Sequence, residues 1–96
     1  MPQASRLNDI DTGHACFPPS NVIAGSGNVI INGLPAARLT DPLAAHGCGR
    51  CTPHARNIAA GSSSVFINGL PSTRVGDAIN CGGTMATGSP NVNVGG

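Results

Sequence analysis

The chain has 96 residues, and its five Arg and four Asp give a formal net charge of +1 with no run of either sign. This balance excludes the basic surface that a nucleic-acid-binding protein needs. No stretch approaches the ~20 consecutive apolar residues of a membrane-spanning helix, and the first residues, MPQASRLND, lack the basic start and apolar middle of a secretory signal. We therefore expect a protein made in the cytoplasm, whose four cysteines are thiols or metal ligands rather than disulfides.

The composition predicts one small all-β domain over 1–96. A chain of this size buries only ~60% of the surface that its unfolded form exposes. Its apolar residues are mainly Ala, Val, Ile and Leu, with two Phe and neither Tyr nor Trp. Fourteen Gly and eight Pro argue against long helices and favour short strands joined by turns. Such a fold needs stabilisation beyond its own core.

One phrase is repeated along the chain, as ASRLND at 4–9, AARLTD at 36–41 and STRVGD at 72–77. The similarity extends further, since GSGNVIINGLP before the second phrase recurs as GSSSVFINGLP before the third, and a truncated copy, GSPNVNVGG, lies at 88–96. Repeats of this length indicate one supersecondary unit used several times, with each copy packed on the next. The predicted repeats are about 4–35, 36–71 and 72–96.

The repeated unit predicts a β-hairpin. The triplets Val-Ile-Ile at 29–31 and Val-Phe-Ile at 65–67 are β-branched or aromatic, and each follows a Gly-Ser turn. Asn-Gly pairs at 32–33 and 68–69 come next, and both residues of such a pair tolerate the positive φ angles of a type I′ turn. Leu-Pro then leads into a return strand. In the last copy Asn93 interrupts the apolar triplet, so that strand is expected to end the structure or to pair with another copy.

The segments between the hairpins are predicted to be loops, at 10–24, 42–60 and 78–87. They differ in length, and they contain every His and Cys of the chain. A scaffold of repeated strands with the chemically active residues confined to loops is a common arrangement. We therefore look for the functional residues in these loops.

Potential metal ligands occur at matching places in successive repeats. His14 and His46 each fall five residues after the Asp of the repeated phrase, and Cys81 falls four residues after it. A structural zinc site takes four protein ligands in a tetrahedron, so the spacing predicts a site with His14, His46, Cys81 and a fourth ligand, either His54 or another cysteine. Cys16 has no counterpart in the other repeats and is predicted to be a buried thiol.

Cys48-Gly-Arg-Cys51 is the main competing motif. Its C-x2-C spacing is typical of a zinc knuckle, but the second C-x2-C or H-x3–5-H pair of such a site does not occur. A redox pair of the thioredoxin type would need the start of a helix in a βαβ unit. The two cysteines are also able to form a disulfide after export or to stay as buried thiols. The residues alone leave open a ligand set that includes Cys48 or Cys51, and a protein without a metal.

The repeated phrase contains an Arg followed by an Asp three residues later. Such a pair is either a general-acid or substrate-binding pair, or a structural ion pair that orients the loop that follows it. Because an active site is seldom repeated three times in a small domain, the repetition favours the structural role. We therefore predict no catalytic residue and a protein that is not an enzyme. The pairs are Arg6 with Asp9, Arg38 with Asp41, and Arg74 with Asp77.

In these features the sequence resembles the PAAR-repeat proteins, which are named for the tetrapeptide Pro-Ala-Ala-Arg found here at 35–38. A second copy reads Pro-Ser-Thr-Arg at 71–74, a looser one reads Ala-Ser-Arg at 4–6, and the resemblance covers essentially the whole chain. It implies a small cone of short β-hairpins with pseudo-threefold symmetry, whose vertex is closed by one structural zinc ion. The family's three His ligands and one Cys ligand correspond to His14, His46, His54 and Cys81.

The resemblance also implies a function, that of the structural tip protein that binds and sharpens the trimeric valine-glycine repeat (VgrG) spike of a type VI secretion system. Three repeats in one chain match a trimeric end, and open strands at the base would continue the partner's sheets. The expected roles are membrane piercing, with transient membrane contact, and delivery of effectors bound non-covalently. The protein would be cytoplasmic when assembled and then exported into a target cell or the medium. No effector domain is expected to be fused to it, because the repeats fill the chain.

Three alternatives belong to other functional classes or systems. The first is the tip of a contractile phage tail spike. The second is a zinc-dependent hydrolase, in which Asp9 or Asp41 would act as a base on a metal-bound water; four available protein ligands argue against it. The third is a metal carrier that uses Cys48 and Cys51. Zinc or iron as the metal, and the identity of the spike protein and effector, are open at this point.

Overall fold

The computed structural model describes residues 1–13, 18–48, 51–80 and 82–95, and within 46–48 and 51–55 it describes the backbone alone. In these ranges the chain is all-β, and its strands pair as two-stranded antiparallel sheets. The all-β prediction is confirmed. No helix in the described ranges is long and apolar enough to cross a membrane. The strands of these ranges are β1 (Ile30–Ile31), β2 (Leu34–Pro35), β3 (Pro42–Cys48), β4 (Cys51–Asn57), β5 (Phe66–Ile67) and β6 (Leu70–Pro71).

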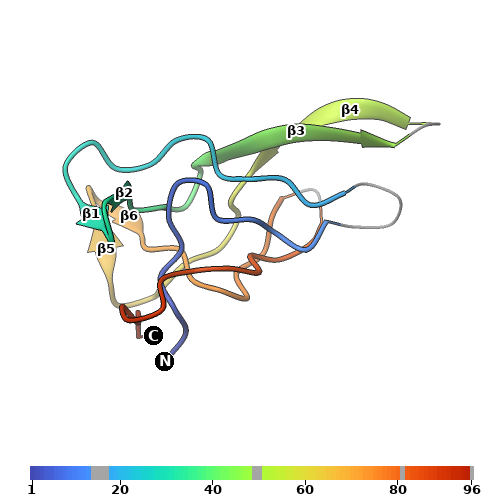
Figure 1. Cartoon of the computed structure of the whole chain (residues 1–96). Coiled ribbons are helices and arrows are strands. Elements are labelled where there is room, and N and C mark those ends of the chain that lie inside the picture. The colour runs from blue at the N-terminus through green and yellow to red at the C-terminus, as the bar shows by residue number, and fades with distance from the viewer. Residues whose placement is uncertain (14–17, 49–50, 81, 96) are drawn as a thin grey trace.

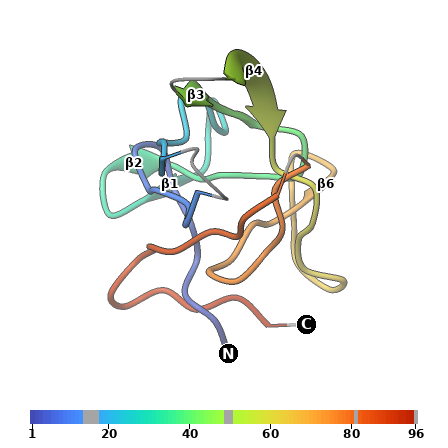
Figure 2. The same cartoon turned by 90° about the vertical axis from the view of Figure 1, so that its right-hand side faces the viewer.

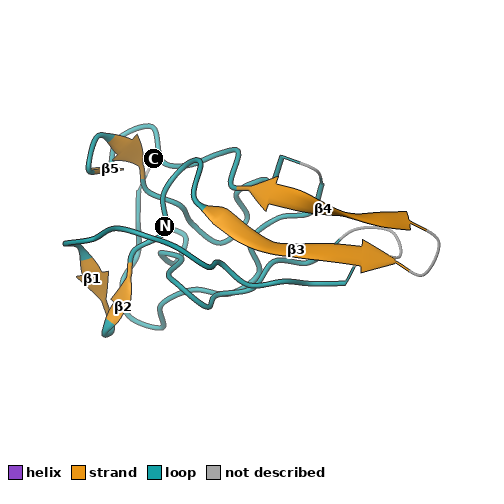
Figure 3. Cartoon of the chain, turned by 90° about the horizontal axis from the view of Figure 1, so that it is seen from above, coloured by secondary structure: helices purple, strands orange, loops and turns teal. Residues whose placement is uncertain are grey.

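The molecule is longer than it is wide, with principal extents of 39 × 23 × 23 Å. The short hairpins β1–β2 and β5–β6 and both chain ends gather at one end of the molecule, whereas β3 and β4 extend toward the other end (Figures 1 and 3). We call the first end the base and the second end the tip. The view along the long direction, with the tip toward the viewer, shows β1–β2, β6 and the two chain ends at separate corners of the molecule (Figure 2).

The predicted hairpins β1–β2 and β5–β6 form at the expected places, but each return strand is the Leu-Pro pair itself rather than the residues after it. In the first, Ile31 pairs with Leu34, and the turn residues Asn32 and Gly33 have φ angles of 53° and 80°. The second repeats this geometry, with 55° and 80° at its Asn-Gly pair. The Asn-Gly prediction is confirmed because these residues adopt a left-handed backbone at little steric cost. Successive side chains of a strand point to opposite faces. In β1 and β5 one side chain is therefore buried in the core, and the residue before it, Ile30 or Phe66, is exposed.

The two ends of the described chain pair with each other in antiparallel fashion. They form a third hairpin-like corner of the base, in which the two strands are not joined by a turn. Gln3 and Asn93 are bridged in antiparallel fashion, and the backbone N–H of Val94 donates to the carbonyl oxygen of Pro2 at 2.8 Å. Val94 occupies the position that Ile31 has in the β1–β2 hairpin, and both are buried. The strand of the last copy therefore pairs with the first residues of the chain, which is one of the two outcomes expected for it.

Backbone hydrogen bonds join the copies of the repeated phrase into a closed ring. The N–H of Ala37 donates to the carbonyl of Ser5 at 3.0 Å, that of Thr73 donates to Ala37 at 3.1 Å, and that of Ser5 donates to Thr73 at 3.0 Å. All these residues are buried. Each copy therefore contacts both of the others, and buried backbone groups that have no neighbouring strand in their own repeat are satisfied across the ring.

Small and aliphatic side chains form the core on the two sides of this ring. The absence of aromatic residues from these buried clusters keeps the core thin, which leaves a chain of this size dependent on other interactions. The cluster on the base side contains Ala4, Ile31, Ala36, Ile67 and Val94, with half-buried Val29 packed against it. The cluster on the tip side contains Val22, Ala37, Leu43, Ile58, Ile79 and Met85.

The prediction of a loop at 42–60 was wrong, because β3 and β4 form the longest hairpin of the described chain. Their sequences, PLAAHGC and CTPHARN, lack the β-branched alternation from which a strand is predicted. Tertiary contacts form the hairpin instead. Buried Leu43 pairs with buried Arg56 and also bridges to Val22, and the N–H of Ala44 donates to the carbonyl of Asn21 at 2.8 Å. The loop at 10–24 thus supports the start of β3.

Candidate functional site

Each copy of the repeated phrase forms the same Arg–Asp clamp. In the second copy, Asp41 Oδ2 accepts from the backbone N–H of Arg38 at 2.8 Å and from its Nε at 2.9 Å, and Oδ1 accepts from Nη2 at 2.9 Å. The hydrogen bond to Asp41 raises the pKa of the Arg38 guanidinium above its ordinary value, so the guanidinium stays charged. The structural role predicted for these pairs is confirmed. The same bonds link Arg6 with Asp9 and Arg74 with Asp77.

The clamps also connect to the hairpins of the base. The amide oxygen of Asn68, at the end of the β5–β6 hairpin, accepts from Ser26 Oγ at 2.6 Å and from Arg38 Nη1 at 3.1 Å, and its Nδ2 donates to Asn28 at 2.8 Å. The turn of one hairpin is therefore fixed to the Gly-Ser turn of another. Asn32 repeats this arrangement with Ser89, Arg6 and Asn91.

The corner formed by the chain ends lacks this Asn-mediated contact with a Gly-Ser turn. Here Ser62 Oγ donates to the backbone carbonyl of Gly95 at 2.5 Å, so a backbone oxygen takes the place of the Asn amide oxygen. Ser64 stands where the other turns have Asn28 and Asn91. Arg74, the counterpart of Arg38, donates to the carbonyl of Gly61 at 3.4 Å in addition to its clamp. The base is therefore closed all round, but one of its corners has fewer side-chain bonds.

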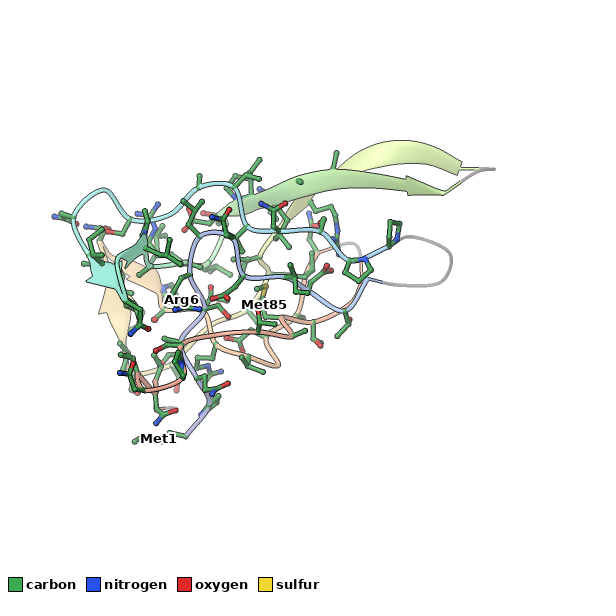
Figure 4. The ribbon with its side chains drawn as sticks, viewed as in Figure 1. Met1, Arg6 and Met85 are labelled. Atoms are coloured by element: carbon green, nitrogen blue, oxygen red, sulfur yellow. The ribbon has the colours of Figure 1, made fainter. Side chains whose placement is uncertain are left out.

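Exposed apolar side chains lie on the hairpins of the base. Ile30 is 55% exposed and Phe66 is 57% exposed, at equivalent positions of β1 and β5. The equivalent residue at the remaining corner is the exposed, polar Asn93. Figure 4 shows Arg6 beside the base hairpins, Met85 farther toward the tip, and Met1 projecting at the chain end. The two Asn-Gly hairpins of the base therefore each present one large apolar side chain to solvent.

The predicted metal ligands are placed by the structure to different extents. His14, Cys16 and Cys81 lie outside the described residues. His46, Cys48, Cys51 and His54 lie on β3 and β4, for which the backbone is described there without the side chains. The backbone register pairs His46 with His54, and Cys48 with Cys51.

This register brings two of the four predicted ligands together. A pair of directly opposed residues in an antiparallel hairpin is the nearest cross-strand neighbourhood that two residues can have. The sequence spacing alone did not provide this relationship, because 42–60 was predicted to be a loop. The register therefore fits the assignment of His46 and His54 to one metal ion, while the assignment itself remains a prediction.

The described residues next to the other ligands also meet. A Cβ atom built on Gly83 would lie 2.7 Å from the carbonyl oxygen of Gly13, so these two backbones are in close contact. Arg56 Nη2 donates to the carbonyl of Gly82 at 3.3 Å. Gly13 precedes His14, Gly82 follows Cys81, and Arg56 lies two residues after His54. The chain thus brings the neighbourhoods of these ligands together, which fits a shared metal ion with four protein donors.

A buried ion pair, which was not predicted from the sequence, joins residues close in sequence to the predicted ligands. Arg56 Nη2 donates to Asp11 Oδ2, and both side chains are fully buried. Burial alone would raise the pKa of Asp11, but hydrogen bonds from Arg56 and from the Ser20 N–H, with the charge of Arg56, hold that pKa below its ordinary value. Comparison of the repeats could have indicated a special role for Asp11, because this charged residue stands where the other copies have the apolar Leu43 and Ile79.

Among the side chains that the structure describes, no three His, Cys, Asp or Glu residues gather into a metal-binding group. No pocket was found in the molecule as described. The ligand set that includes Cys48 or Cys51, the hydrolase and the metal carrier therefore stay hypotheses beside the predicted zinc site. What the structure does provide is a closed base and, toward the tip, contacts among described residues that neighbour the predicted ligands.

Comparison with known proteins gives a clear family assignment. No curated protein is significantly similar to the chain. The family model of the PAAR motif matches residues 12–87, which is most of the chain. The match begins in the loop at 10–24 and includes both complete Asn-Gly hairpins of the base, β1–β2 and β5–β6. With its ring of repeated phrases and its converging loops, this protein belongs to the PAAR-motif family.

Proposed function

We propose that this protein is the structural tip of a type VI secretion spike, seated by its base on the blunt end of a trimeric VgrG-type protein. The PAAR motif is associated with the spike-tip proteins of type VI secretion, and this family is one of structural tip proteins rather than of enzymes. The observation that carries the proposal furthest is the closed ring of Ser5, Ala37 and Thr73, because it arranges three copies of one phrase around a common centre.

A single chain with this arrangement suits a trimeric partner. Each subunit of a symmetric trimer presents the same surface, and three similar corners allow one chain to make comparable contacts with all of them. The hairpins at the corners are short, and their strands pair in twos. Their free edges are suited to continue the strands of a partner β-helix by β-strand addition.

Ile30 and Phe66 are the proposed apolar anchors of this interface. Both are more than half exposed, and each lies beside a buried residue of the base core, Ile31 or Ile67. Burial of such side chains at the centre of an interface commonly provides most of the binding free energy. Asn93 would occupy the third corner as a polar contact.

At the tip we propose one structural zinc ion held by His14, His46, His54 and Cys81. The pairing of His46 with His54 and the contact of Gly13 with Gly83 support this set. A zinc ion bound there would cross-link the loops and contribute ~10 kcal/mol or more to folding. The protein's own contribution is to bring the four ligand-bearing segments together.

The rest of the proposal concerns the working cycle. The protein would be cytoplasmic when the spike is assembled and would then be exported with it into a target cell or the medium. A small, stiff tip would contact the target membrane transiently during piercing, and effectors bound non-covalently would travel with it.

Binding to a purified trimeric VgrG-type spike protein tests the central claim. Light scattering after gel filtration should give one chain per trimer. Ile30→Asp and Phe66→Asp should each weaken binding at least about tenfold, because each variant places a charge in the apolar part of the interface.

Ile23→Asp is the matched control, since Ile23 is 52% exposed but lies outside the base hairpins. This variant should bind the spike as the wild type does. Unchanged binding by an Ile30→Asp, Phe66→Asp double variant that is folded would refute the proposed interface.

A further inference from the structure

We propose that Arg56 and Asp11 are positioning residues of the tip, which hold the β3–β4 hairpin and the loops at 10–24 and 78–87 together and so preset the metal centre. This inference rests on the metal centre of the proposed function. It concerns residues that are not themselves metal ligands, and it assigns a role to an ion pair that the repeated architecture does not require.

The ion pair connects the β3–β4 hairpin with both of these loops. Arg56, from β4, donates through Nη1 to Ser20 Oγ at 2.6 Å and through Nη2 to Asp11 Oδ2. The same Nη2 donates to the carbonyl of Gly82 at 3.3 Å. Asp11 and Ser20 belong to the loop at 10–24, and Gly82 belongs to the loop at 78–87. One guanidinium group therefore holds the segments that carry the predicted ligands.

Asp11 is fixed from its own side as well. Its Oδ1 accepts from the backbone N–H of Ser20 at 2.9 Å, and both carboxylate oxygens are therefore used. The Asp11 side chain is fully buried, as is that of Arg56. A buried charge pair is held strongly when its remaining donors and acceptors are satisfied, and the loss of one partner leaves an uncompensated charge.

The repeats show how space for this pair arises. Val22, Ile58 and Met85 make equivalent backbone bonds to the three phrases, so the residues two positions before them are also equivalent. These residues are Ser20, Arg56 and Gly83. One copy thus provides a long side chain, and the other two provide a small one or none.

Gly83 cannot be enlarged without disturbing the pair. A Cβ atom at this position would lie 2.7 Å from the carbonyl oxygen of Gly13 and 3.1 Å from Asp11 Oδ2. Its φ of 82° is also unfavourable for other residues. The position that the three repeats share is therefore filled by one arginine and its counter-ion, in a space that three equivalent residues would otherwise occupy.

The Arg56–Asp11 ion pair and its bonds to Ser20 and Gly82, which we call the lock, lie close in sequence to the ligands that they would position. Arg56 lies two residues after His54, and Gly82 lies next to Cys81. Asp11 lies three residues before His14. Because the contacts of the lock need no metal ion, the loops are expected to be assembled before the metal binds. The metal then binds to a preformed group of ligands rather than having to order them.

Cobalt titration of purified, metal-free protein tests the proposal, because Co²⁺ in a tetrahedral site with a thiolate ligand has characteristic visible absorption bands. The variants are Asp11→Asn, Arg56→Met and the milder Arg56→Lys, which keeps the charge. At a temperature where each variant is folded, we expect Co²⁺ affinity to fall by ~10–100-fold, as is typical when residues that orient metal ligands are changed.

Ile67→Ala is the matched control, because it weakens the base core without touching the tip. It should lower the melting temperature and leave the Co²⁺ affinity and spectrum unchanged. If Asp11→Asn does not fold, Arg56→Lys provides the test. Unchanged Co²⁺ affinity in a folded lock variant, or an equal loss in Ile67→Ala, would show that the pair is merely structural and would overturn the proposal.

Spike binding by the same proteins separates this inference from the proposed function. The lock variants should still bind the trimeric spike protein, because the base is intact in them. A wild-type protein that binds no Co²⁺ or Zn²⁺ but binds the spike would overturn the lock and leave the spike-tip function standing. A wild-type protein that binds the metal but not the spike would overturn the spike-tip function and leave the lock standing.

Discussion

The backbone N–H of Val94 donates to the carbonyl oxygen of Pro2 at 2.8 Å, so residues from the two ends of the described chain complete one hairpin of the base. The other hairpins are each closed by an Asn-Gly turn, whereas this one is held by pairing and packing alone. Its stability should therefore depend strongly on the side chain of Val94, which is buried in the base core.

Val94→Ala is expected to destabilise the protein by about 1–2 kcal/mol, because two buried methyl groups contribute ~0.8 kcal/mol each. Thermal unfolding followed by circular dichroism should show a lower melting temperature by roughly 4–8 °C per kcal/mol. Val92→Ala is the control, since Val92 is 36% exposed, and it should change the melting temperature little. Equal losses in the two variants would contradict the packing argument.

Substitution of Arg38 should lower the free energy of unfolding more than substitution of Arg74, although the two residues occupy the same position of the repeat. Both form an Arg–Asp clamp, but Arg38 also donates to Asn68 at 3.1 Å, and the corner at Arg74 has Gly95 in the equivalent place. Lys cannot make the bidentate contact of Arg. Arg38→Lys should therefore cost about 1–2 kcal/mol and Arg74→Lys less, as measured by urea denaturation. A larger loss of stability for Arg74→Lys would show that the hydrogen bond between Arg38 and Asn68 does not stabilise the fold.

Thr40→Gly is expected to stabilise the protein. Thr40 has a φ of 77°, which is unfavourable for a β-branched residue, and the equivalent residues of the other copies are Asn8 and Gly76. The side chain of Thr40 is exposed, so its removal leaves no cavity. Relief of the strain should add ~1 kcal/mol to the free energy of unfolding. Asn93→Gly, at an exposed position without a positive φ, should instead be neutral or destabilising.

Acid should weaken the protein through Asp11. Because the folded state holds the pKa of Asp11 below its ordinary value of 3.8, the carboxylate stabilises the fold fully above that value. This stabilisation is lost as the pH falls through the lower pKa of the folded state. Denaturant unfolding at pH values from above 3.8 to well below it should show the loss in metal-free wild type.

Asp11→Asn should lack this part of the acid dependence while being less stable at neutral pH. Chelator is present throughout, since protonation of metal ligands would add a second pH effect. An identical fall in stability for wild type and Asp11→Asn would exclude Asp11 as the titrating group.

Local signals in the sequence predicted the base correctly. The Asn-Gly pairs and the β-branched triplets act through a few neighbouring residues, and both hairpins formed where these signals placed them. The repeated Arg and Asp were correctly assigned a structural role, because a contact between residues three apart is set by the phrase itself. The β3–β4 hairpin was missed because its strands are supported by distant residues such as Val22.

By itself, the sequence determined the two Asn-Gly hairpins of the base, the repetition of one phrase along the chain, and the placement of the histidines and cysteines between its copies. The tertiary structure decided how the copies close on one another. Only the fold pairs Pro2 with Val94, sets His46 opposite His54, and buries Asp11 against Arg56. These relationships join residues that no local rule connects. They arise because the repeats must satisfy one another's backbone groups and share one small interior.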